Sequence, residues 1–184
     1  MMENISKYGE SVTVVQVGGS NYKVVIRQDT DTEGPREWDN EGTMLCWHSR
    51  YNLGDKQIPR PEGVEDVPED VVRLPLYLYD HGGLTMSTAP FSCGWDSGQV
   101  GWIYAKLEDP EDEQERARVT KNLIGEVEVY DMYLTGQVYG YRVYKQTEDD
   151  PDEKVGSCWG YYGDHDKSGL FDAVKQEISN GIPE

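Results

Sequence analysis

The sequence predicts an α+β fold in which a mostly antiparallel sheet carries two main helices packed on it, in a single domain over residues 1–184. Three observations support this prediction. Runs rich in Val, Tyr and Leu alternate with glycine-rich or acidic turns, and two later segments space their apolar residues as helices do. Residues 74–105 contain no Lys or Arg in a chain that is 28% charged, so we expect the buried centre of the fold there.

Length, cysteine content and hydropathy indicate a soluble protein of the cytoplasm. A chain of 184 residues is long enough for one well-buried core, and no stretch has the composition of a linker. The N-terminus lacks the apolar run of a signal peptide, and no window approaches the length of a membrane span. Three cysteines outside any CxxC pair fit free thiols in a reducing compartment. We therefore expect no membrane partner.

The first half of the chain predicts strands. Residues 11–28 place β-branched runs on either side of Gly18 and Gly19, which is the composition of a β-hairpin. A phosphate-binding loop at these glycines is disfavoured because a strand pattern follows where a helix would have to begin. The further strands expected in this half are residues 43–48, 74–79, 84–88 and 99–105, with Tyr77 and Tyr79 on one face and Leu76 and Leu78 on the other.

The segment after residue 108 predicts the first helix. Asp109 supplies an N-cap, Pro110 suits the first helical position, and the acids that follow suit the positive end of the helix dipole. Gly136 can end the helix, and Gly125 costs roughly 1 kcal/mol relative to alanine, so a break into two helices stays open. The apolar positions that continue the helix are Val119, Leu123, Val127, Tyr130 and Leu134.

The C-terminal part predicts a second hairpin and a second helix. Residues 137–146 and 154–162 are rich in Tyr and Val, and the acidic residues 147–153 between them form the hairpin tip. Ser168 is the expected cap of the last helix, which ends at Asn180 and Gly181. Its apolar stripe is Leu170, Phe171, Val174 and Ile178.

Negative charge is gathered into four segments. Residues 29–41, 62–70, 108–115 and 148–153 hold 22 of the 35 carboxylates, with Arg36 as their only base, although the formal net charge of the whole chain is −18. Such segments attract basic protein surfaces and repel phosphate backbones. The leading hypothesis is a non-enzymatic protein that binds a basic surface of another protein through Glu111, Asp112, Glu113, Glu148, Asp149, Asp150, Asp152 and Glu153.

Direct binding of nucleic acid is disfavoured by the same distribution. The 20 aromatic residues invite a base-stacking interpretation, but nucleic-acid binders pair such rings with Lys and Arg. The only concentration of bases along the sequence is Arg50, Lys56 and Arg60. We therefore expect the aromatic residues to fill the core or to form a protein-binding surface.

A rival hypothesis places an enzyme or metal centre in the uncharged central segment. Cys46 and His48 stand two apart on a predicted strand, as a zinc pair requires, and a cysteine nucleophile with a histidine partner stays open. Residues 93–98 resemble the nucleophile segment of chymotrypsin-like proteases, but Trp95 stands where a glycine would donate to the oxyanion hole. The rival residues are Cys46, His48, Asp80, His81, Cys93, Asp96 and Ser97; we expect no cofactor and no bound metal.

Two acidic turns have part of the pattern of a calcium-binding loop. Residues 164–175 match its early positions, but Lys175 stands where a bidentate glutamate belongs. Residues 29–40 begin in the same way, and Asn40 then replaces the glutamate. A turn is therefore the favoured interpretation of both.

Four segments, residues 35–55, 74–104, 130–141 and 157–164, resemble a family of small acidic proteins of tailed bacteriophages and prophages. The family has no assigned activity, so the resemblance implies no catalytic residue. What it implies is context: an accessory phage product in the host cytoplasm that acts on a host or phage protein, for example by covering the DNA-binding site of a defence nuclease.

Overall fold

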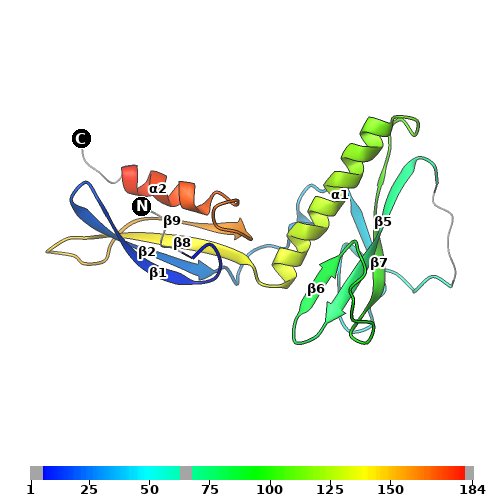
Figure 1. The fold of residues 1–184 in the computed structure, drawn as a ribbon, viewed down its shortest axis with the longest axis horizontal. Helices are drawn as coiled ribbons and strands as arrows, with labels where there is room; N and C mark the ends of the chain where they lie inside the picture. Colours follow the sequence, from blue (N-terminus) through cyan, green and yellow to red (C-terminus); the bar gives the residue numbers. More distant parts are fainter. Residues whose placement is uncertain (1–5, 63–67, 181–184) are drawn as a thin grey trace. The chain divides into compact units, whose positions relative to one another are not determined.

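The computed structural model describes residues 6–62 and 68–180, which group into two compact units (Figure 1). Unit 1 comprises the described residues of 1–32 and 136–184, and unit 2 those of 33–135. Each unit contains one mostly antiparallel sheet and one α-helix, so the predicted α+β class is confirmed, with two sheets in place of one. The single domain over residues 1–184 stays a prediction, because two compact units can still fold cooperatively.

Unit 1 is a four-stranded antiparallel sheet in the order β1-β2-β8-β9, and both predicted hairpins are present. The first hairpin turns at Gly18 and Gly19, whose φ angles of 57° and 81° favour glycine at both positions. The elements of unit 1 are β1 (Ser11–Val17), β2 (Ser20–Gln28), β8 (Val138–Gln146), β9 (Glu153–Tyr162) and helix α2 (Leu170–Asn180).

Helix α2 covers one face of this sheet (Figure 1). The buried face of the sheet is built from alternate residues, so that Tyr22, Val24 and Ile26 point toward the helix and their neighbours point away. All four residues of the predicted apolar stripe of α2 are buried against them. This core lies outside residues 74–105, the segment expected to hold the buried centre of the fold.

The predicted cap at Ser168 is wrong. Its hydroxyl is buried without a hydrogen-bond partner in the described part of the chain, and Gly169, with a φ of 81°, precedes the helix. The preceding turn is stabilised by Asp164 instead, whose carboxylate accepts from the backbone of Asp166 and Lys167. These bonds, the one to Lys167 above all, lower the pKa of Asp164, and residues 165–169 form a turn as expected.

His165 joins the start of α2 to the N-terminal residues. Its side chain is fully buried, with ring centroids 4.7 Å from Tyr139 and 5.7 Å from Phe171. Nδ1 lies 3.0 Å from the carbonyl oxygen of Ser6, and the backbone N–H donates to the carbonyl oxygen of Lys7 at 3.0 Å. Burial lowers the pKa of His165, because the apolar surroundings disfavour the charged ring.

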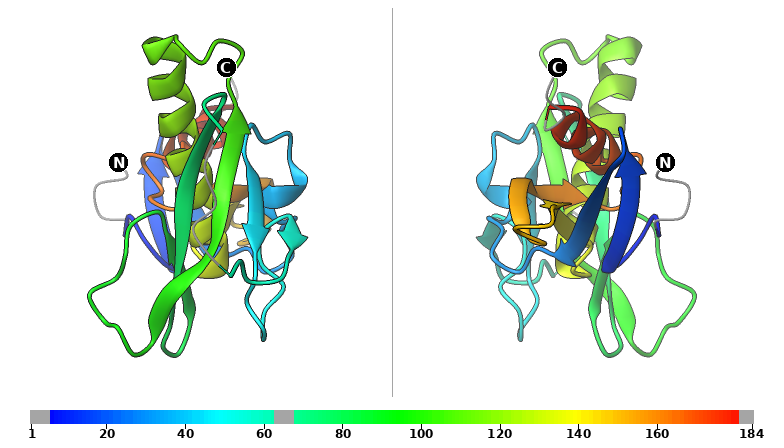
Figure 2. Two further views of the ribbon diagram at one scale, coloured as in Figure 1. Left: turned by 90° about the vertical axis from the view of Figure 1, so that its right-hand side faces the viewer. Right: turned by 90° about the vertical axis from the view of Figure 1, so that its left-hand side faces the viewer.

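Unit 2 is a five-stranded sheet in the order β4-β3-β7-β5-β6, antiparallel except for the β3/β4 pair. Helix α1 packs on one face of it, against β5, β6 and β7 (Figure 2). The elements are the 3-10 turn η1 (Pro35–Glu37), β3 (Thr43–Cys46), β4 (Lys56–Gln57), β5 (Val71–Asp80), β6 (Leu84–Ser87), β7 (Ser97–Lys106) and α1 (Glu113–Leu134).

The strands of unit 2 match the predicted ones, with shifted ends. Leu76 and Leu78 are buried as expected, while Tyr77 and Tyr79 lie half-buried on the other face. The prediction that residues 74–105 form the buried centre holds for the strands but not for residues 88–96, where Trp95 is 95% exposed. The absence of bases there does not reflect burial, because residues 88–96 form a loop outside the strands.

Helix α1 begins three residues later than expected. Asp112 is its N-cap and accepts from the N–H groups of Gln114 and Glu115. The carboxylate of Glu115 accepts from the backbone of Glu108 and Asp109, which keeps that segment outside the helix. The helix then runs unbroken to Leu134. Neither α1 nor α2, nor any other helix in the described ranges, is long and apolar enough to span a membrane.

A buried ion network joins three parts of unit 2 around Arg36, whose side chain is only 8% exposed. Its guanidinium donates to both carboxylate oxygens of Asp55 at 2.9 and 2.8 Å, to Glu126 at 2.7 Å and to the carbonyl of Gly42 at 2.6 Å. Asp55 also accepts from the N–H of Met44 at 2.7 Å. The network therefore fixes the segment before β3, β3 itself and the middle of α1 to one another.

We predict that Arg36→Met lowers the free energy of unfolding by about 3 kcal/mol, because it leaves two partly buried carboxylates without their cation. The matched control is Arg118→Met, which removes the contacts of a 55% exposed arginine with Glu41 and Glu115 and should cost less than about 1 kcal/mol. Urea unfolding of both variants measures the difference. Equal losses would contradict the structural role given to Arg36.

We also predict a pH effect from His165. Because its folded pKa is lowered, the unfolded chain takes up a proton first as the pH falls below about 6.5, and the folded state loses stability there. The free energy of unfolding should therefore fall faster between about pH 7.5 and 5.5 in the wild type than in His165→Phe, by at most about 1.4 kcal/mol per pH unit. Parallel curves in urea titrations would show that the histidine carries no such linkage.

Candidate functional site

Four of the seven rival residues meet around one cavity in unit 2. The cavity has a volume of about 270 Å³ and lies where β5 ends and β7 begins. We call it the His48 pocket. Its lining is His48, Arg50, Leu78, Asp80, Trp95, Asp96, Ser97, Gly98 and Val100.

His48 is held by backbone donors. Its Nδ1 atom accepts from the N–H groups of Arg50 at 3.3 Å and Tyr51 at 3.2 Å, and its ring stacks on Tyr51 at 4.9 Å between centroids. Because Nδ1 is used as an acceptor, the neutral ring carries its proton on Nε2. The geometry thus fixes the orientation of the His48 ring.

The two carboxylates of the pocket have cationic or polar partners. Asp80 accepts from Arg50 at 2.6 Å and lies 3.5 Å from the hydroxyl of Tyr51. Asp96 lies 3.1 Å from Nδ1 of His81, and its carbonyl accepts from the backbone of Asp80 at 2.8 Å. The pocket therefore presents donors and acceptors together, which suits binding of a small polar group.

No serine triad forms here. The hydroxyl of Ser97 donates to the carbonyl of Cys93, and within residues 6–62 and 68–180 no hydrogen bond joins Ser97 to a histidine. The loop carrying Trp95 also lies open to solvent. The resemblance to a protease nucleophile segment is therefore confined to the order of residue types.

The three cysteines are free thiols in different surroundings. Cys46 is fully buried at the end of β3, and burial raises its pKa to about 12, so its thiolate is suppressed. Cys93 is half-buried in unit 2 and Cys158 exposed in unit 1. In the part of the chain that the structure describes, no three Cys, His or carboxylate side chains gather as metal ligands. The strand ends at Cys46, so His48 lies beyond it and the period-two argument for a zinc pair does not apply.

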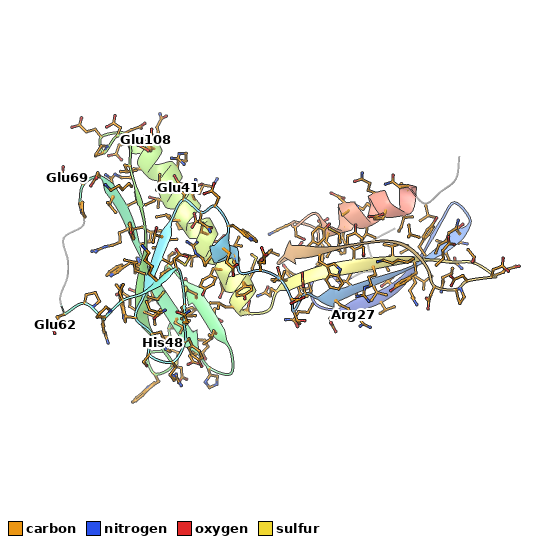
Figure 3. All side chains as sticks on the ribbon, turned by 180° about the vertical axis from the view of Figure 1, so that it is seen from behind. Arg27, Glu41, His48, Glu62, Glu69 and Glu108 are labelled. Atoms are coloured by element: carbon orange, nitrogen blue, oxygen red, sulfur yellow. The ribbon has the colours of Figure 1, made fainter. Side chains whose placement is uncertain are left out.

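Two acidic segments far apart in sequence meet at one end of unit 2. The N–H of Leu107 donates to the carbonyl of Asp70 at 2.8 Å, and Arg116 donates to the carbonyl of Glu69. Figure 3 shows Glu69 and Glu108 at the same end, opposite His48. We define the acidic end as Glu69, Asp70, Glu108, Asp109, Glu111, Asp112, Glu113 and Glu115.

Some carboxylates of the acidic end serve the fold. Asp112 caps α1, and Asp109 accepts from the backbone of Glu111. Backbone hydrogen bonds from Asp109 and Glu108 lower the pKa of Glu115. For the side chains of Glu69, Glu108, Glu111 and Glu113, the described residues provide no hydrogen-bond or ion-pair partner, so these four remain open to a partner. Glu69 and Glu108 were missed as site residues because only the β5/β7 pairing joins their segments.

The predicted acids of the second hairpin form a separate surface, in unit 1. Asp150 accepts from the backbone of Asp152, and Asp152 forms an ion pair with Lys23. The carbonyl of Asp150 also accepts from Thr147, which closes the tip. Five tip residues are predicted to bind a partner. In the described structure the side chains of three of them form no hydrogen bond or ion pair that holds the tip: Glu148, Asp149 and Glu153.

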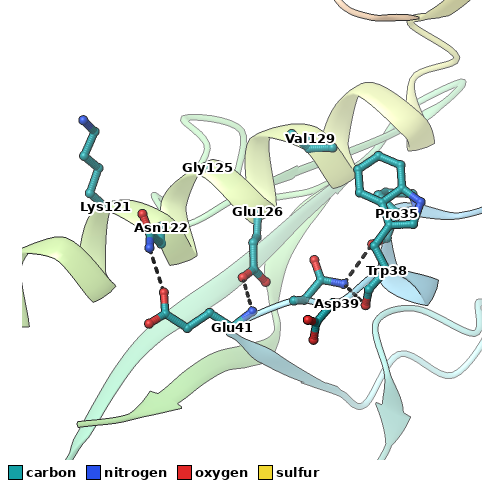
Figure 4. A pocket seen from close by; sticks show the side chains of 10 residues that line it. Pro35, Trp38, Asp39, Glu41, Lys121, Asn122, Gly125, Glu126 and Val129 are labelled. Atoms are coloured by element: carbon teal, nitrogen blue, oxygen red, sulfur yellow. Dashed lines mark hydrogen bonds between the residues drawn. The ribbon is translucent and has the colours of Figure 1, made fainter. Parts of the chain in front are cut away.

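A larger groove of about 520 Å³ runs beside α1 (Figure 4). Trp38, 48% exposed, lies near Val129, and Asn40 holds its loop by donating to the carbonyls of Pro35 and Trp38. No atom lies within 4 Å of the position that a Cβ atom at Gly125 would take, so the groove is open above the helix there. The lining is Pro35, Trp38, Asp39, Asn40, Glu41, Lys121, Asn122, Gly125, Glu126 and Val129.

These features define an α+β protein of two sheet-and-helix units, in which unit 2 carries a polar pocket, a groove and an acidic end. Comparisons with known proteins give no match: no family model matches the chain, and neither do any curated proteins or solved structures. The residues themselves therefore carry the functional argument.

Proposed function

We propose that this protein is a non-enzymatic, phage-type accessory protein whose acidic end binds a basic surface of a host or phage protein. The observation that carries the proposal is the meeting of two acidic segments at the end of the β5/β7 pair, with four carboxylates that the fold does not use. Residues 33–135 as a whole contain 21 acids and 9 bases. The field of unit 2 therefore favours a cationic partner.

Local cations neutralise the acidic end only in part, since Arg118 lies 3.9 Å from the carboxylate of Glu115, with the arginine itself 55% exposed. Arg116 donates to two backbone carbonyls, those of Glu69 and Pro110, rather than to a carboxylate. Lys106 lies 3.8 Å from Asp70, and both side chains are well exposed, so this pair contributes little. A partner rich in Lys and Arg would supply the missing charges, and the DNA-binding face of a nuclease is a surface of that kind.

The groove beside α1 offers apolar contact next to the charged contact. It is lined by residues 121–129 of the helix that begins at the acidic end, about 12 Å further along the helix axis. Trp38 and Val129 supply apolar surface there. Complexes that combine a buried apolar anchor with a charged rim reach useful affinity, whereas exposed charge pairs alone add little.

We predict that Glu111→Lys with Glu113→Lys reduces capture of the partner from phage-infected host lysate at least tenfold at low salt. The control pair Glu37→Lys with Glu128→Lys makes the same charge change at exposed positions of unit 2 outside the acidic end, and should retain capture. Capture by the wild type should weaken at about 0.5 M salt, where screening is strong. Circular dichroism checks that the variants remain folded.

A second arm tests the groove. Gly125→Ala should leave capture intact and raise the free energy of unfolding by about 0.5–1 kcal/mol. Alanine has the higher helix propensity, and its Cβ atom would meet no other atom within 4 Å. Gly125→Leu fills more of the groove and should weaken capture. If capture survives charge reversal unchanged at low salt, the electrostatic proposal is wrong.

A second candidate function is binding or conversion of a small polar ligand in the His48 pocket. The observation in its favour is that His48, Asp80, Asp96 and Ser97 meet there. We predict that the wild type, incubated with a host metabolite extract, retains a small molecule that mass spectrometry detects. His48→Ala should retain none. Recovery of no ligand, or equal recovery with both proteins, would reject this candidate.

A further inference from the structure

The sheet face of unit 1 opposite α2 gathers cations that the sequence scatters. In β2, Lys23 and Arg27 alternate with the buried residues and therefore point away from the helix. Arg27 is labelled in Figure 3, on the side of the sheet away from α2. Across the sheet, Tyr144 of β8 pairs with Lys23 on one side and with Lys154 of β9 on the other, so the three side chains share a face. We call this surface the outer face.

Aromatic rings lie among these cations. Nζ of Lys23 lies 5.0 Å from the ring centroid of Tyr144, and Cζ of Arg142 lies 5.4 Å from the ring of Trp159. A Cβ atom at Gly140 would overlap the indole of Trp159, so this ring rests directly on the backbone of β8. Trp159 is nevertheless 39% exposed. The outer face thus holds a supported aromatic platform beside a guanidinium.

The charge of the outer face differs from that of the rest of the chain. Residues 1–32 and 136–184 contain eight bases, and four of them lie on this face: Lys23, Arg27, Arg142 and Lys154. Asp152 pairs with Lys23, and the acidic hairpin tip lies beside Lys154. The positive part of the face is therefore the end with Arg27, Arg142 and Trp159.

We propose that the outer face binds single-stranded nucleic acid, with phosphates on Arg27 and Arg142 and a base stacked near Trp159. Cations interleaved with exposed rings on an open four-stranded sheet are the chemistry that such strands require. An acidic peptide would use the cations and leave the aromatic platform without a role. A duplex keeps its bases stacked and offers none to the ring. This proposal goes beyond partner binding at the acidic end, which belongs to the other unit.

Fluorescence anisotropy of the full chain with labelled oligodeoxythymidylate and oligouridylate of about 12 nucleotides tests the proposal, with a duplex of equal length for comparison. Single strands of one or both kinds should bind more tightly than the duplex at about 50 mM salt. Arg27→Ala with Arg142→Ala should weaken binding at least tenfold and reduce the slope of log K against log salt by about 1.4. Trp159→Ala should weaken binding about tenfold, and Trp159→Phe much less.

The matched control is Lys167→Ala with Lys175→Ala, which removes two cations from the same unit but away from the outer face, and should change affinity less than twofold. Glu111→Lys with Glu113→Lys should leave the effect of Trp159→Ala unchanged, which separates this site from the acidic end. Absence of binding by the wild type, or equal losses in the control pair, would overturn the proposal. Competition by polyglutamate together with full binding by Trp159→Ala would also overturn it and assign the face to acidic peptides.

Discussion

The buried guanidinium of Arg36 is the constraint on which the arrangement of unit 2 depends. It binds Asp55 with two parallel hydrogen bonds and Glu126 with a third, and so connects α1 to the segment before β3. The same segment forms one wall of the groove, and Glu126 forms part of the other. Without this cation the carboxylates would repel each other inside a unit that is already strongly acidic. The ion network therefore joins the two walls of the groove.

Local patterns in the sequence predicted most elements, because hairpin turns and helical spacing act over short distances. Gly18 with Gly19 marked the first turn, and the stripe from Val119 to Tyr130 marked α1. The predicted N-cap at Ser168 failed because the N–H of Phe171, which such a cap would accept from, donates to the carbonyl of His165 instead. The division into two sheets was beyond reach, since β2 pairs with β8 across more than 100 residues.

The candidate sites show the same limit. The clustering of charge in the sequence predicted Glu111 and Glu113 as site residues. That Glu69 lies at the same end of unit 2 depends on the pairing of β5 with β7, which the sequence does not reveal. His48 and Asp80 were identified by residue type, and the structure brings them to one pocket, whereas Cys46 turned inward. Arg36 is the only base in the four acidic segments, and the sequence does not indicate its role. In the structure it is the buried centre of an ion network.

The distribution of charge between the units bears on how the two proposed surfaces differ. Unit 2 carries 21 acids against 9 bases, while unit 1 carries 14 against 8 and places half of those bases on the outer face. A net charge of −18 opposes polyanions at long range, but screening limits that field to about 10 Å at ordinary ionic strength. A single-stranded nucleic acid at the outer face would therefore interact mainly with Arg27, Arg142 and Trp159. A basic protein at the acidic end would interact with the glutamates of unit 2. One chain can therefore bind an anionic ligand on one unit and a cationic partner on the other.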